Sequence, residues 1–520
     1  ANSHFDIRTY GDRADVKLNA NLFVSNDLTA NSLGTGDSAW VRIQVADGSL
    51  LNENGSYIAG AGAYVQIKAK NAIGTNAKPI LTRVATLTIA TSTHGSGDVV
   101  IREDDNLVLI EERALTSPEN PGYVIFADQS HPSWNTRWES TVDWDNNVAA
   151  GASVWRDLIR KNRSVIRPDI AVEVGRGNLR IELELTDALL TLQSGYLQML
   201  KTGANVHLIT DDLNFVSGVN RVVGTGELRI QAKRNAWHYV IGTAAETQGG
   251  LDYEEDSDQQ VNNPAMYVSN RDLAALADGF DHLIIGHIDT DGSITGTNTM
   301  RVGDVTDTNL VRYTGVARAE NSRSAAFNDR TTLKADLMNI AGEVTAPVDT
   351  LTLNANNLWV ESQNHWDPSG LPLSGVHAKN TILDVAEQIL IGGWVKADDR
   401  VEIQTTGAPG ASPQYFAPIY LADAGHNSLQ LDALGLISSI NDESTVVIRT
   451  TGSIETRGMI DIKGDDSSLD VLAQGPVIVA EGTTIQGLDL NAELKIASNN
   501  VVAINPGSSI RSGIFMTSPD

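Results

Sequence analysis

Acidic pairs next to a basic residue are the groups in this sequence that could do acid–base chemistry. The run IDIKGDD places Asp465 and Asp466 just after Lys463, and the run DDR at 398–400 combines the same residue types. Such groups can bind Ca²⁺, lower the acidity barrier of a sugar carbon, or act as acid and base in polysaccharide lyases and glycoside hydrolases. A Gly-Asp-Asp run in a β-rich chain is more often a solvated corner, so we predict no catalytic residues.

Two loops carry Asp residues at alternate positions, as the oxygen ligands of a hard cation often do. The segment DWDNN contributes Asp143 and Asp145, and the segment DTDG contributes Asp289 and Asp291. Neither segment is followed by the Glu that completes a calcium loop, and no nonapeptide repeat is present. Ca²⁺ is therefore the one cofactor that the sequence leaves open, and an acidic, solubilising surface is the favoured interpretation of both loops.

Four tryptophans lie close together in the sequence and could bind sugars. They are Trp134, Trp138, Trp144 and Trp155. If exposed, Trp134 and Trp138 would stack on sugar faces as in a lectin, whereas buried tryptophans would seal the side of a β structure that an inserted helix covers. The second interpretation is favoured, and the first makes a cell-surface polysaccharide a candidate partner.

A basic run and an acidic run could bind each other between two copies of the chain. The basic run surrounds WRDLIRKNR and consists of Arg156, Arg160, Lys161, Arg163 and Arg167. The acidic run consists of Asp252, Glu254, Glu255, Asp256 and Asp258. Pairing within one molecule, or a solvated helix face, is the simpler explanation. We nevertheless assign both runs to self-association, because opposite charges set the orientation and the rate of such contacts.

Motifs of nucleotide-binding and hydrolytic enzymes are missing from the sequence. It contains no Gly-Lys dipeptide, hence no phosphate-binding loop of the usual type, and no GxGxxG, GxSxG or HExxH motif. Cysteine is absent, which excludes disulfides, thiolate metal sites and Cys nucleophiles together. We therefore do not expect an enzyme. The alternatives are a carbohydrate-active enzyme of the lyase or hydrolase type and a carbohydrate-binding module.

The overall charge argues against partners that are themselves anionic. The 520 residues include 38 Lys and Arg but 65 Asp and Glu, a net charge of -27, so nucleic acids and anionic lipid surfaces would be repelled. No apolar run is long enough to span a bilayer, so membrane insertion is not expected. The first residues, ANSHFDIRTY, show neither an initiator Met nor a signal peptide, which predicts a mature product or a piece of a longer chain.

The elements that would position these groups are short β-strands. Alternating apolar and polar residues recur in runs bounded by Gly, Asn, Asp or Ser, and clean helical periodicity is rare. Similar segments begin at Val446, Val477 and Val501, and each passes from a Val-rich run through a Gly turn to Ile. Strand repeats of roughly 20 to 30 residues are typical of a solenoid, in which each coil is buried only by stacking on the next. The sequence therefore predicts an all-β solenoid.

Two short non-β excursions interrupt the predicted solenoid. The first contains the tryptophans and places the basic run on a short helix, and the second opens with the acidic run. In the second, Ser269 and Asp272 have the spacing of a capping box, and apolar residues at helical spacing follow as far as Phe280, which predicts a short helix. The predicted organisation is solenoid at 1–130, excursion at 131–175, solenoid at 176–250, excursion at 251–326 and solenoid at 327–520.

Two parts of the sequence resemble a family of bacterial proteins. IGTNAKPILTRVATL at 73–87 with GDVVIREDDNLVLIEE at 97–112, and MYVSNRDLAALADGFDHLIIGHIDTDGSITG at 266–296, are similar to recurrent units of giant surface proteins related to filamentous haemagglutinin. The resemblance implies a right-handed parallel β-helix (β-solenoid) that is extracellular, either secreted or at the bacterial cell surface. It also implies a structural or adhesive protein that self-associates into a fibre, matrix or layer. The N-terminal secretion module of a complete family member is not present in the sequence.

Overall fold

Almost every described residue of the protein lies in or next to a β-strand. The computed structural model describes residues 4–9, 13–24, 39–92, 95–112, 170–234, 238–242, 265–287, 298–303, 324–361, 374–406, 429–431, 435–487, 489 and 491–512. The strands are joined by parallel pairings, and α3 (Asn270–Ala275) is the helix among the described residues. The prediction of an all-β fold with parallel strands is confirmed. No helix in this part of the chain has the length and apolar character that a membrane crossing needs.

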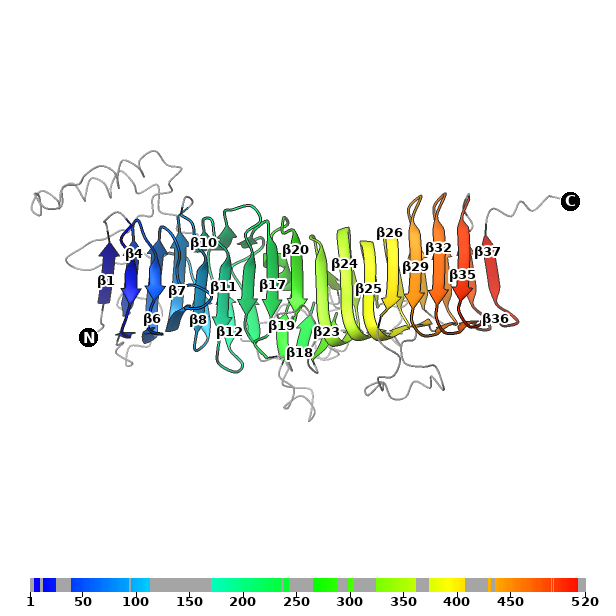
Figure 1. Ribbon diagram of the computed structural model, residues 1–520, viewed down its shortest axis with the longest axis horizontal. Helices are drawn as coiled ribbons and strands as arrows, with labels where there is room; N and C mark the ends of the chain where they lie inside the picture. The colour runs from blue at the N-terminus through cyan, green and yellow to red at the C-terminus, as the bar shows by residue number, and fades with distance from the viewer. Residues whose placement is uncertain are drawn as a thin grey trace, which may run out of the picture. The chain divides into compact units, whose positions relative to one another are not determined.

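The chain divides into two units. Figure 1 draws the strands of both units, coloured by residue number. Unit 1 comprises Ala1–Lys233 and Ala274–Asp281, and unit 2 comprises Arg234–Leu273 and His282–Asp520. The strands of unit 1 are β1 (His4–Thr9), β2 (Val16–Leu18), β3 (Leu22–Phe23), β4 (Trp40–Val45), β5 (Leu50–Asn52), β6 (Tyr57–Ala69), β7 (Ile80–Thr91), β8 (Val99–Glu103), β9 (Leu107–Leu109), β10 (Ile170–Val174), β11 (Leu179–Leu183), β12 (Leu189–Leu192), β13 (Tyr196–Met199), β14 (Val206–Ile209), β15 (Asp212–Phe215), β16 (Val222–Val223) and β17 (Glu227–Gln231).

Three parallel ladders run through unit 1. One joins β8, β11, β14 and β17, a second joins β9, β12 and β15, and a third joins β7, β10, β13 and β16. The third ladder begins with β1, β4 and β6, which lead into β7. We call three consecutive strands, one from each ladder, a layer. Each strand therefore pairs with the strand in the same ladder of the next layer.

Residue alternation explains why these strands bury one side. In β11, Leu179, Ile181 and Leu183 are buried, whereas Arg180 between them points outward and is half-buried. The same alternation recurs in β14 and β17 at the positions that pair with β11. A parallel ladder places paired residues of successive layers on the same side, so the inward residues of all layers form one continuous apolar interior.

A long segment outside the described residues, 113–169, comes between β9 and β10 without shifting the ladder that contains β8. Equivalent side chains at the start of this ladder's strands are joined by hydrogen bonds. The Asn178 N–H donates to Asp98 Oδ1 across this segment, 80 positions earlier. The Asn205 N–H donates to Asn178 Oδ1, 27 positions earlier, and the Glu227 N–H donates to Asn205 Oδ1, 22 positions earlier. The ladder therefore continues in register from one side of the segment to the other.

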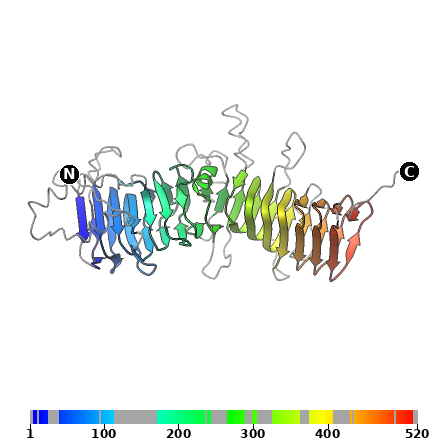
Figure 2. The same cartoon turned by 90° about the horizontal axis from the view of Figure 1, so that it is seen from above.

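Unit 2 has the same construction. Its strands are β18 (His238–Ile241), β19 (Ala265–Val268), β20 (His282–Gly286), β21 (Thr299–Val302), β22 (Ser324–Ala326), β23 (Thr331–Ile340), β24 (Glu343–Val360), β25 (Gly375–Ile391), β26 (Trp394–Thr405), β27 (Leu429–Leu431), β28 (Leu436–Ser439), β29 (Thr445–Thr450), β30 (Ile454–Thr456), β31 (Met459–Ile462), β32 (Ser468–Ala473), β33 (Val477–Val479), β34 (Thr484–Gly487), β35 (Glu493–Ser498), β36 (Val502–Ile504) and β37 (Ser509–Ser512). Figure 2 shows β23 to β26, in green and yellow, lying side by side.

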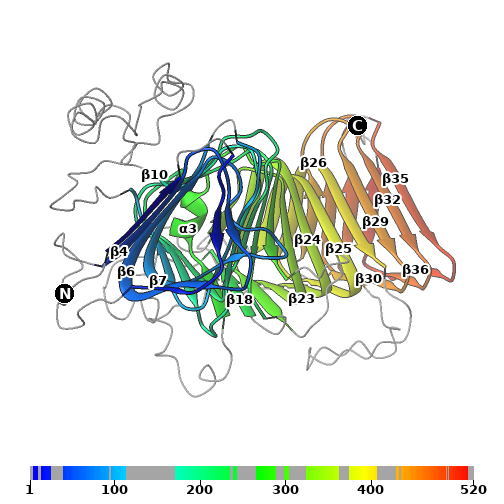
Figure 3. The ribbon, with the colours of Figure 1, turned by 60° about the vertical axis from the view of Figure 1, so that its left-hand side comes forward.

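Toward β37 the layers of unit 2 become regular. The ladders are β29–β32–β35, β27–β30–β33–β36 and β28–β31–β34–β37. Figure 3 shows β29, β32 and β35 on one side of this unit and β30 and β36 on another. Hydrogen bonds between successive layers show the repeat length: the Asp465 N–H donates to Asp442, 23 positions earlier, and Gln486 Nε2 donates to Asp461, 25 positions earlier. The predicted repeat length of roughly 20 to 30 residues is confirmed.

The similar segments that begin at Val446 and Val477 do not correspond to each other in the structure, contrary to the repeat predicted from the sequence. Val446 lies in β29 and pairs with Leu469, whereas Val477 lies in β33 and pairs with Val502. The two segments belong to different ladders, so their spacing is not a structural repeat. Every ladder places Val, Ile or Leu at alternate inward positions, and this shared pattern does not distinguish one ladder from another.

The second predicted excursion contains the predicted helix but also several strands. Ser269 Oγ donates to Asp272 Oδ2 at 2.6 Å, and the Ser269 N–H donates to the same carboxylate at 2.9 Å, so the capping box at the start of α3 is confirmed. The helix ends at Ala275 because the chain then returns to β pairing, with Leu276 opposite Val222. β19 to β22 lie within 251–326, and β10 lies within the first predicted excursion at 131–175. These strands correct the prediction that both stretches are non-β.

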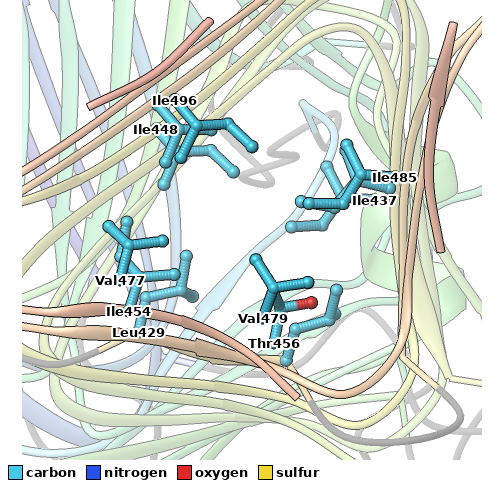
Figure 4. Close-up of a pocket in the computed structure, with 12 residues that line it drawn as sticks. Leu429, Ile437, Ile448, Ile454, Thr456, Val477, Val479, Ile485 and Ile496 are labelled. Carbon is cyan, nitrogen blue, oxygen red and sulfur yellow. The ribbon is translucent and has the colours of Figure 1, made fainter. Parts of the chain in front are cut away.

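The interior of unit 2 is packed by columns of aliphatic side chains. Figure 4 shows the columns Leu429–Ile454–Val477, Thr456–Val479, Ile437–Ile485 and Ile448–Ile496 around a small central space. This cavity has a volume of about 10 Å³, which is close to the room that one water needs. Its lining is aliphatic except for Thr456, so it is a packing defect and not a ligand site.

Candidate functional site

The last layer, made of β35, β36 and β37, is paired on one side only among the described residues. β35 pairs with β32, β36 pairs with β33, and β37 pairs with β34. The opposite edge of these three strands carries backbone N–H and C=O groups that the described residues leave without a strand partner. Such an edge is a ready template for another strand. We call it the open edge.

Side-chain exposure changes abruptly at the open edge. In the preceding layer, five inward-facing aliphatic side chains are exposed by at most 3%: Leu469, Val471, Val477, Val479 and Ile485. In the last layer the corresponding residues are Leu494 and Ile496, which are half-buried, and Val502 (39% exposed), Ile504 (59%) and Ile510 (38%).

These exposed residues continue the buried columns of the interior. Val502 pairs with Val477, Ile504 pairs with Val479, and Ile510 with Ile485. Fully burying one aliphatic side chain of this size stabilises a protein by roughly 1.5–3 kcal/mol. Because the exposed side chains are contiguous and aligned with an existing core, a further layer of strands would find both hydrogen bonds and apolar contacts here.

Charged side chains flank the open edge on the outer face of β35. The Lys495 Nζ atom lies 3.7 Å from Asp470 Oδ1, and an Arg449 Nη2 atom lies 3.9 Å from the other oxygen of the same carboxylate. Both pairs are largely exposed, so they contribute little to stability. Lys495 points outward next to the open edge and is therefore placed to meet a charge on whatever strand is added to β35.

A network of ion pairs on the outer face of unit 1 is the second candidate site. The Arg180 Nη2 atom donates to Glu182 Oε2 at 2.9 Å, and Lys233 Nζ donates to Glu182 Oε1 and lies 3.2 Å from Glu184 Oε1. Arg102 Nε is 3.0 Å from Glu184 Oε1. The network joins β8, β11 and the residues that follow β11 and β17, so the ladder register brings together groups from distant parts of the sequence.

The electrostatics of this network hold Glu182 in its ionised form. Burial by itself would raise the pKa of Glu182, but hydrogen bonds from Lys233 and Arg180 and the positive charges of Lys233 and Arg102 outweigh burial and lower the pKa to about 2. A carboxyl group that is ionised throughout the neutral range cannot donate a proton to a leaving group. The basic side chains are also occupied by carboxylates. The network is therefore suited to hold strands together, and Glu182 is not suited to act as a general acid.

Buried charges on the outer side of β4 and β6 are also paired, as in the network around Glu182. Arg42 and Lys68 are each about 2% exposed; Arg42 binds Asp6, and Lys68 Nζ lies 2.6 Å from Glu112 Oε1. Burial opposes ionisation of Asp6, but the hydrogen bonds and charges of Arg42 and Arg8 lower its pKa below the usual value. Removing one partner of such a pair leaves an uncompensated buried charge.

The carboxylates of the IDIKGDD run form a turn. Glu443, Asp466 and Asn491 have φ values of 57°, 57° and 60° at equivalent corners of three successive layers. Asn491 Nδ2 donates to Asp466 Oδ1 at 2.8 Å, and the Asp465 N–H donates to Asp442 Oδ1 at 3.0 Å. Asn and Asp adopt left-handed backbone more easily than most residues, which suits them to these corners. These contacts support the interpretation of this run as a solvated corner.

The basic residues of both acidic runs have partners elsewhere. Lys463 Nζ lies 3.5 Å from Asp461 Oδ2, and Arg400 Nη2 donates to Glu402 Oε2 at 2.9 Å. Asp398 Oδ1 is 3.0 Å from His377 Nε2. Within the described ranges, no group of three or more His, Asp or Glu side chains is arranged to hold a metal ion.

The residues that the sequence singled out for binding lie outside the described residues. This applies to the self-association residues Arg156, Arg160, Lys161, Arg163, Arg167, Asp252, Glu254, Glu255, Asp256 and Asp258. It applies equally to the sugar-stacking and metal candidates Trp134, Trp138, Asp143, Asp145, Asp289 and Asp291. Their predicted roles stay predictions.

Sequence reasoning missed both candidate sites for identifiable reasons. The segment VVAINPGSSIRSG, which contains β36 and β37, has the same apolar pattern as the buried layers, and nothing in that pattern reveals that its aliphatic side chains are exposed among the described residues. The ion-pair network had one weak signal, the alternation of opposite charges around apolar residues in LRIELE at 179–184. Its partners Arg102 and Lys233 become neighbours only through the register of the ladders.

Comparison with known proteins identifies no relative of this chain. No family model matches its sequence, no curated protein matches it, and no solved structure matches its fold.

Proposed function

We propose that this protein is an extracellular structural or adhesive protein of the bacterial cell surface or matrix, and that it self-associates into a fibre or layer. Its architecture is a right-handed parallel β-helix in this proposal. The edge formed by β35–β37 is the observation that carries the proposal, because among the described residues these strands are paired on one side only and their exposed aliphatic residues are in register with a buried core.

The strand order supports the β-helix. In the last layers of unit 2, each ladder receives every third strand, and equivalent residues of successive layers lie 23 to 25 positions apart. A chain that returns to the same ladder after each circuit winds around a common interior, which Figure 4 shows lined by side chains from all three ladders. Parallel crossover connections are right-handed in the great majority of proteins, which favours a right-handed winding.

The character of the surface supports a structural role outside the cell. The net charge of -27 keeps the chain soluble despite its open edge and repels anionic nucleic acids. Folding requires no disulfide, because the sequence contains no cysteine. A cell-surface polysaccharide remains a proposed partner through the tryptophan-rich segment, and the basic and acidic runs remain a proposed contact between copies.

The experiment that tests self-association combines sedimentation velocity with electron microscopy over a range of protein concentrations. We expect filaments or sheets whose amount grows with concentration. Ile504→Lys places a charge in the open edge and should reduce assembly. Val348→Lys is the matched control, because Val348 is similarly exposed, at 63%, but lies within β24 and not in the last layer. Monodisperse wild-type protein at every concentration, or equal losses in both variants, would contradict the proposal.

The carbohydrate-active alternative receives less support from the described carboxyl groups. Glu182 is held ionised by its basic neighbours, and Glu103, whose pKa burial raises to about 8, is fully buried in the interior. A glycosidase needs a general acid that reaches its substrate, whereas Glu182 is ionised and Glu103 is buried. Activity of dispersed monomers on an acidic polysaccharide would favour this alternative over self-association.

A further inference from the structure

We infer that Trp394 and Lys396, on the outer face of unit 2, bind an acidic sugar whose neighbours in a polysaccharide are neutral. The sugar ring packs on the Trp394 ring, and its carboxylate binds the Lys396 ammonium group. This site is separate from the open edge and does not depend on the proposed self-association. It supplies a ligand for an adhesive surface.

The site lies on the outer face of a regular parallel ladder. β24, β25 and β26 pair with one another, and the ladder continues through β28 and β31. In β26, Val395 and Ala397 are fully buried, whereas Trp394 and Lys396 alternate with them, face outward and are half-buried. Equivalent side chains of successive strands lie about 4.8 Å apart, a step close to that of one sugar in an extended polysaccharide.

A glycine on the neighbouring strand holds the Trp394 ring in place. Gly375 of β25 is the residue that pairs with Trp394. A Cβ atom built on Gly375 would overlap the ring atoms Cδ2, Cε2 and Cγ of Trp394, so the ring occupies the space that a side chain would fill there. An aromatic ring offers an apolar face to the CH groups of a sugar, and a ring held before binding loses less conformational freedom.

Lys396 places a positive charge beside this ring. Its Nζ atom lies 4.8 Å from the centroid of the Trp394 ring, and it forms no ion pair within the described ranges. Burial lowers the pKa of Lys396 below its usual value of 10.5, and the charge of Lys463 adds to this, while the charge of Glu343 opposes it. A half-buried ammonium group in these surroundings is stabilised by a carboxylate that accepts its hydrogen bonds.

The other cationic side chains around Lys396 already have carboxylate partners. His377, which pairs with Lys396 in the ladder, has its Nε2 atom 3.0 Å from Asp398 Oδ1. Lys463 Nζ lies 3.5 Å from Asp461 Oδ2. Of these three cationic groups, Lys396 is therefore the one that can take the carboxylate of a ligand.

The positions on both sides of the site favour neutral sugars next to the acidic one. Glu343 lies two strands before Trp394 in the ladder and is exposed, so it repels a second carboxylate on that side. Asp461 lies two strands after Lys396, and its charge is balanced by Lys463. Both carboxylates can accept hydrogen bonds from sugar hydroxyls. The net charge of -27 also disfavours a ligand in which every sugar is acidic.

Isothermal titration calorimetry of the full chain, at concentrations below those that give assembly, tests this site. The probe is a glucuronoxylan oligosaccharide that carries a single glucuronate on neutral xyloses. The matched probes are the same oligosaccharide with its carboxyl group reduced, and an oligogalacturonate of equal length. We expect the single glucuronate to bind about tenfold more tightly than its reduced form, because the reduced form loses the charge-assisted hydrogen bonds to Lys396. The oligogalacturonate should also bind more weakly, and Glu343→Gln should narrow that difference.

Three variants assign the binding to the named residues. Lys396→Met should weaken binding about tenfold, whereas Lys396→Arg should keep most of it. Gly375→Ala displaces the Trp394 ring and should weaken binding to the glucuronate probe with Lys396 unchanged. Lys379→Met is the matched control, because Lys379 is an exposed lysine of the same ladder whose Nζ atom lies 3.9 Å from Asp399. Circular dichroism and thermal unfolding show that each variant keeps its fold.

The outcomes separate this site from the proposed function. Absence of binding to the glucuronate probe, equal binding of its reduced form, or equal losses in Lys396→Met and Lys379→Met would overturn the inference. None of these results bears on self-association, which sedimentation velocity measures without a ligand. Selective binding by a chain that stays monodisperse at every concentration would support the sugar site and contradict assembly. If Lys396→Met does not fold, the comparison of the two matched oligosaccharides on the wild type decides.

Discussion

Glu103 gives the sharpest prediction of how the stability of this fold depends on pH. It is the last residue of β8 and points inward, paired between Thr82 of β7 and Leu183 of β11. Its side chain is fully buried, and its oxygens accept hydrogen bonds from the Val84 N–H at 3.2 Å and 3.3 Å and from the Asp105 N–H at 3.3 Å. A carboxyl group in this place joins Val84 of β7 to the end of β8.

Burial raises the pKa of Glu103 from its usual value of 4.5 to about 8, and the charge of Asp104 adds to this, while the hydrogen bonds from Thr82, Asp105 and Val84 oppose it. The folded state therefore holds a proton that the unfolded state releases between these two pH values. The free energy of unfolding should be constant below pH 4.5, fall as the pH rises, and level off above about 8. The separation of the two pKa values corresponds to a loss of at most about 5 kcal/mol.

Replacing Glu103 with Gln tests this reasoning, because Gln keeps the shape and one acceptor but does not titrate. Amide hydrogen exchange of peptides that cover β7 and β8, measured between pH 5 and pH 9 and corrected for intrinsic rates, gives the local free energy of opening. In the wild type this quantity should fall with pH, and in Glu103→Gln it should stay nearly level and exceed the wild-type value at pH 8. Glu481→Gln, at an exposed turn after β33, is the control that should keep the wild-type slope. Equal slopes in the wild type and Glu103→Gln, or a rise with pH in the wild type, would refute the reasoning.

The remaining predictions concern the ion-pair network, the interior and assembly. The folded-state pKa of Glu182 is lowered to about 2, so its stabilisation of unit 1 is present above the usual pKa of 4.5 and should be lost as the pH falls toward 2. In urea unfolding, Glu182→Gln should therefore remove about 1–3 kcal/mol of acid-sensitive stability. This range is reduced because the basic partners of Glu182 are partly exposed. Thr456 is 2% exposed, and its Oγ1 has no hydrogen-bond partner among the described residues. Thr456→Val should therefore raise the free energy of unfolding of unit 2, measured by thermal unfolding, by about 1–2 kcal/mol. A decrease would contradict the interpretation that the hydroxyl is unsatisfied. Replacing three arginines of the basic run with Glu should reduce assembly without changing the circular dichroism spectrum; the three are Arg156, Arg160 and Arg163. Placing Lys at positions 254, 255 and 256 of the same variant should partly restore assembly. Chelation should loosen assemblies if divalent ions bridge carboxylates between copies, and unchanged order and melting temperature after chelation would exclude a calcium role.

The sequence by itself determined the type of fold and some local structure. Alternating Val, Ile and Leu in short runs, separated by Gly, Asn and Asp, predicted an all-β chain with repeats of roughly 20 to 30 residues, and these features depend only on side-chain period and turn chemistry. The spacing of Ser269 and Asp272 predicted the start of α3, because a capping box is made by residues three apart. Local patterns of this kind can be read without knowing which segments meet in space.

The tertiary structure alone decided which residues become neighbours. Val446 and Val477 look equivalent in sequence but lie in different ladders, because all ladders use the same inward residues. Glu182 meets Lys233 only because layers stack at a fixed register. Ile504 repeats the pattern of the buried Val479 and yet is exposed, since burial depends on stacking against a further layer, and no described residues stack on β36 on that side. The apolar pattern of a stacked β structure shows which side chains of a layer face the interior. Only the stacking of the layers determines whether those side chains are buried.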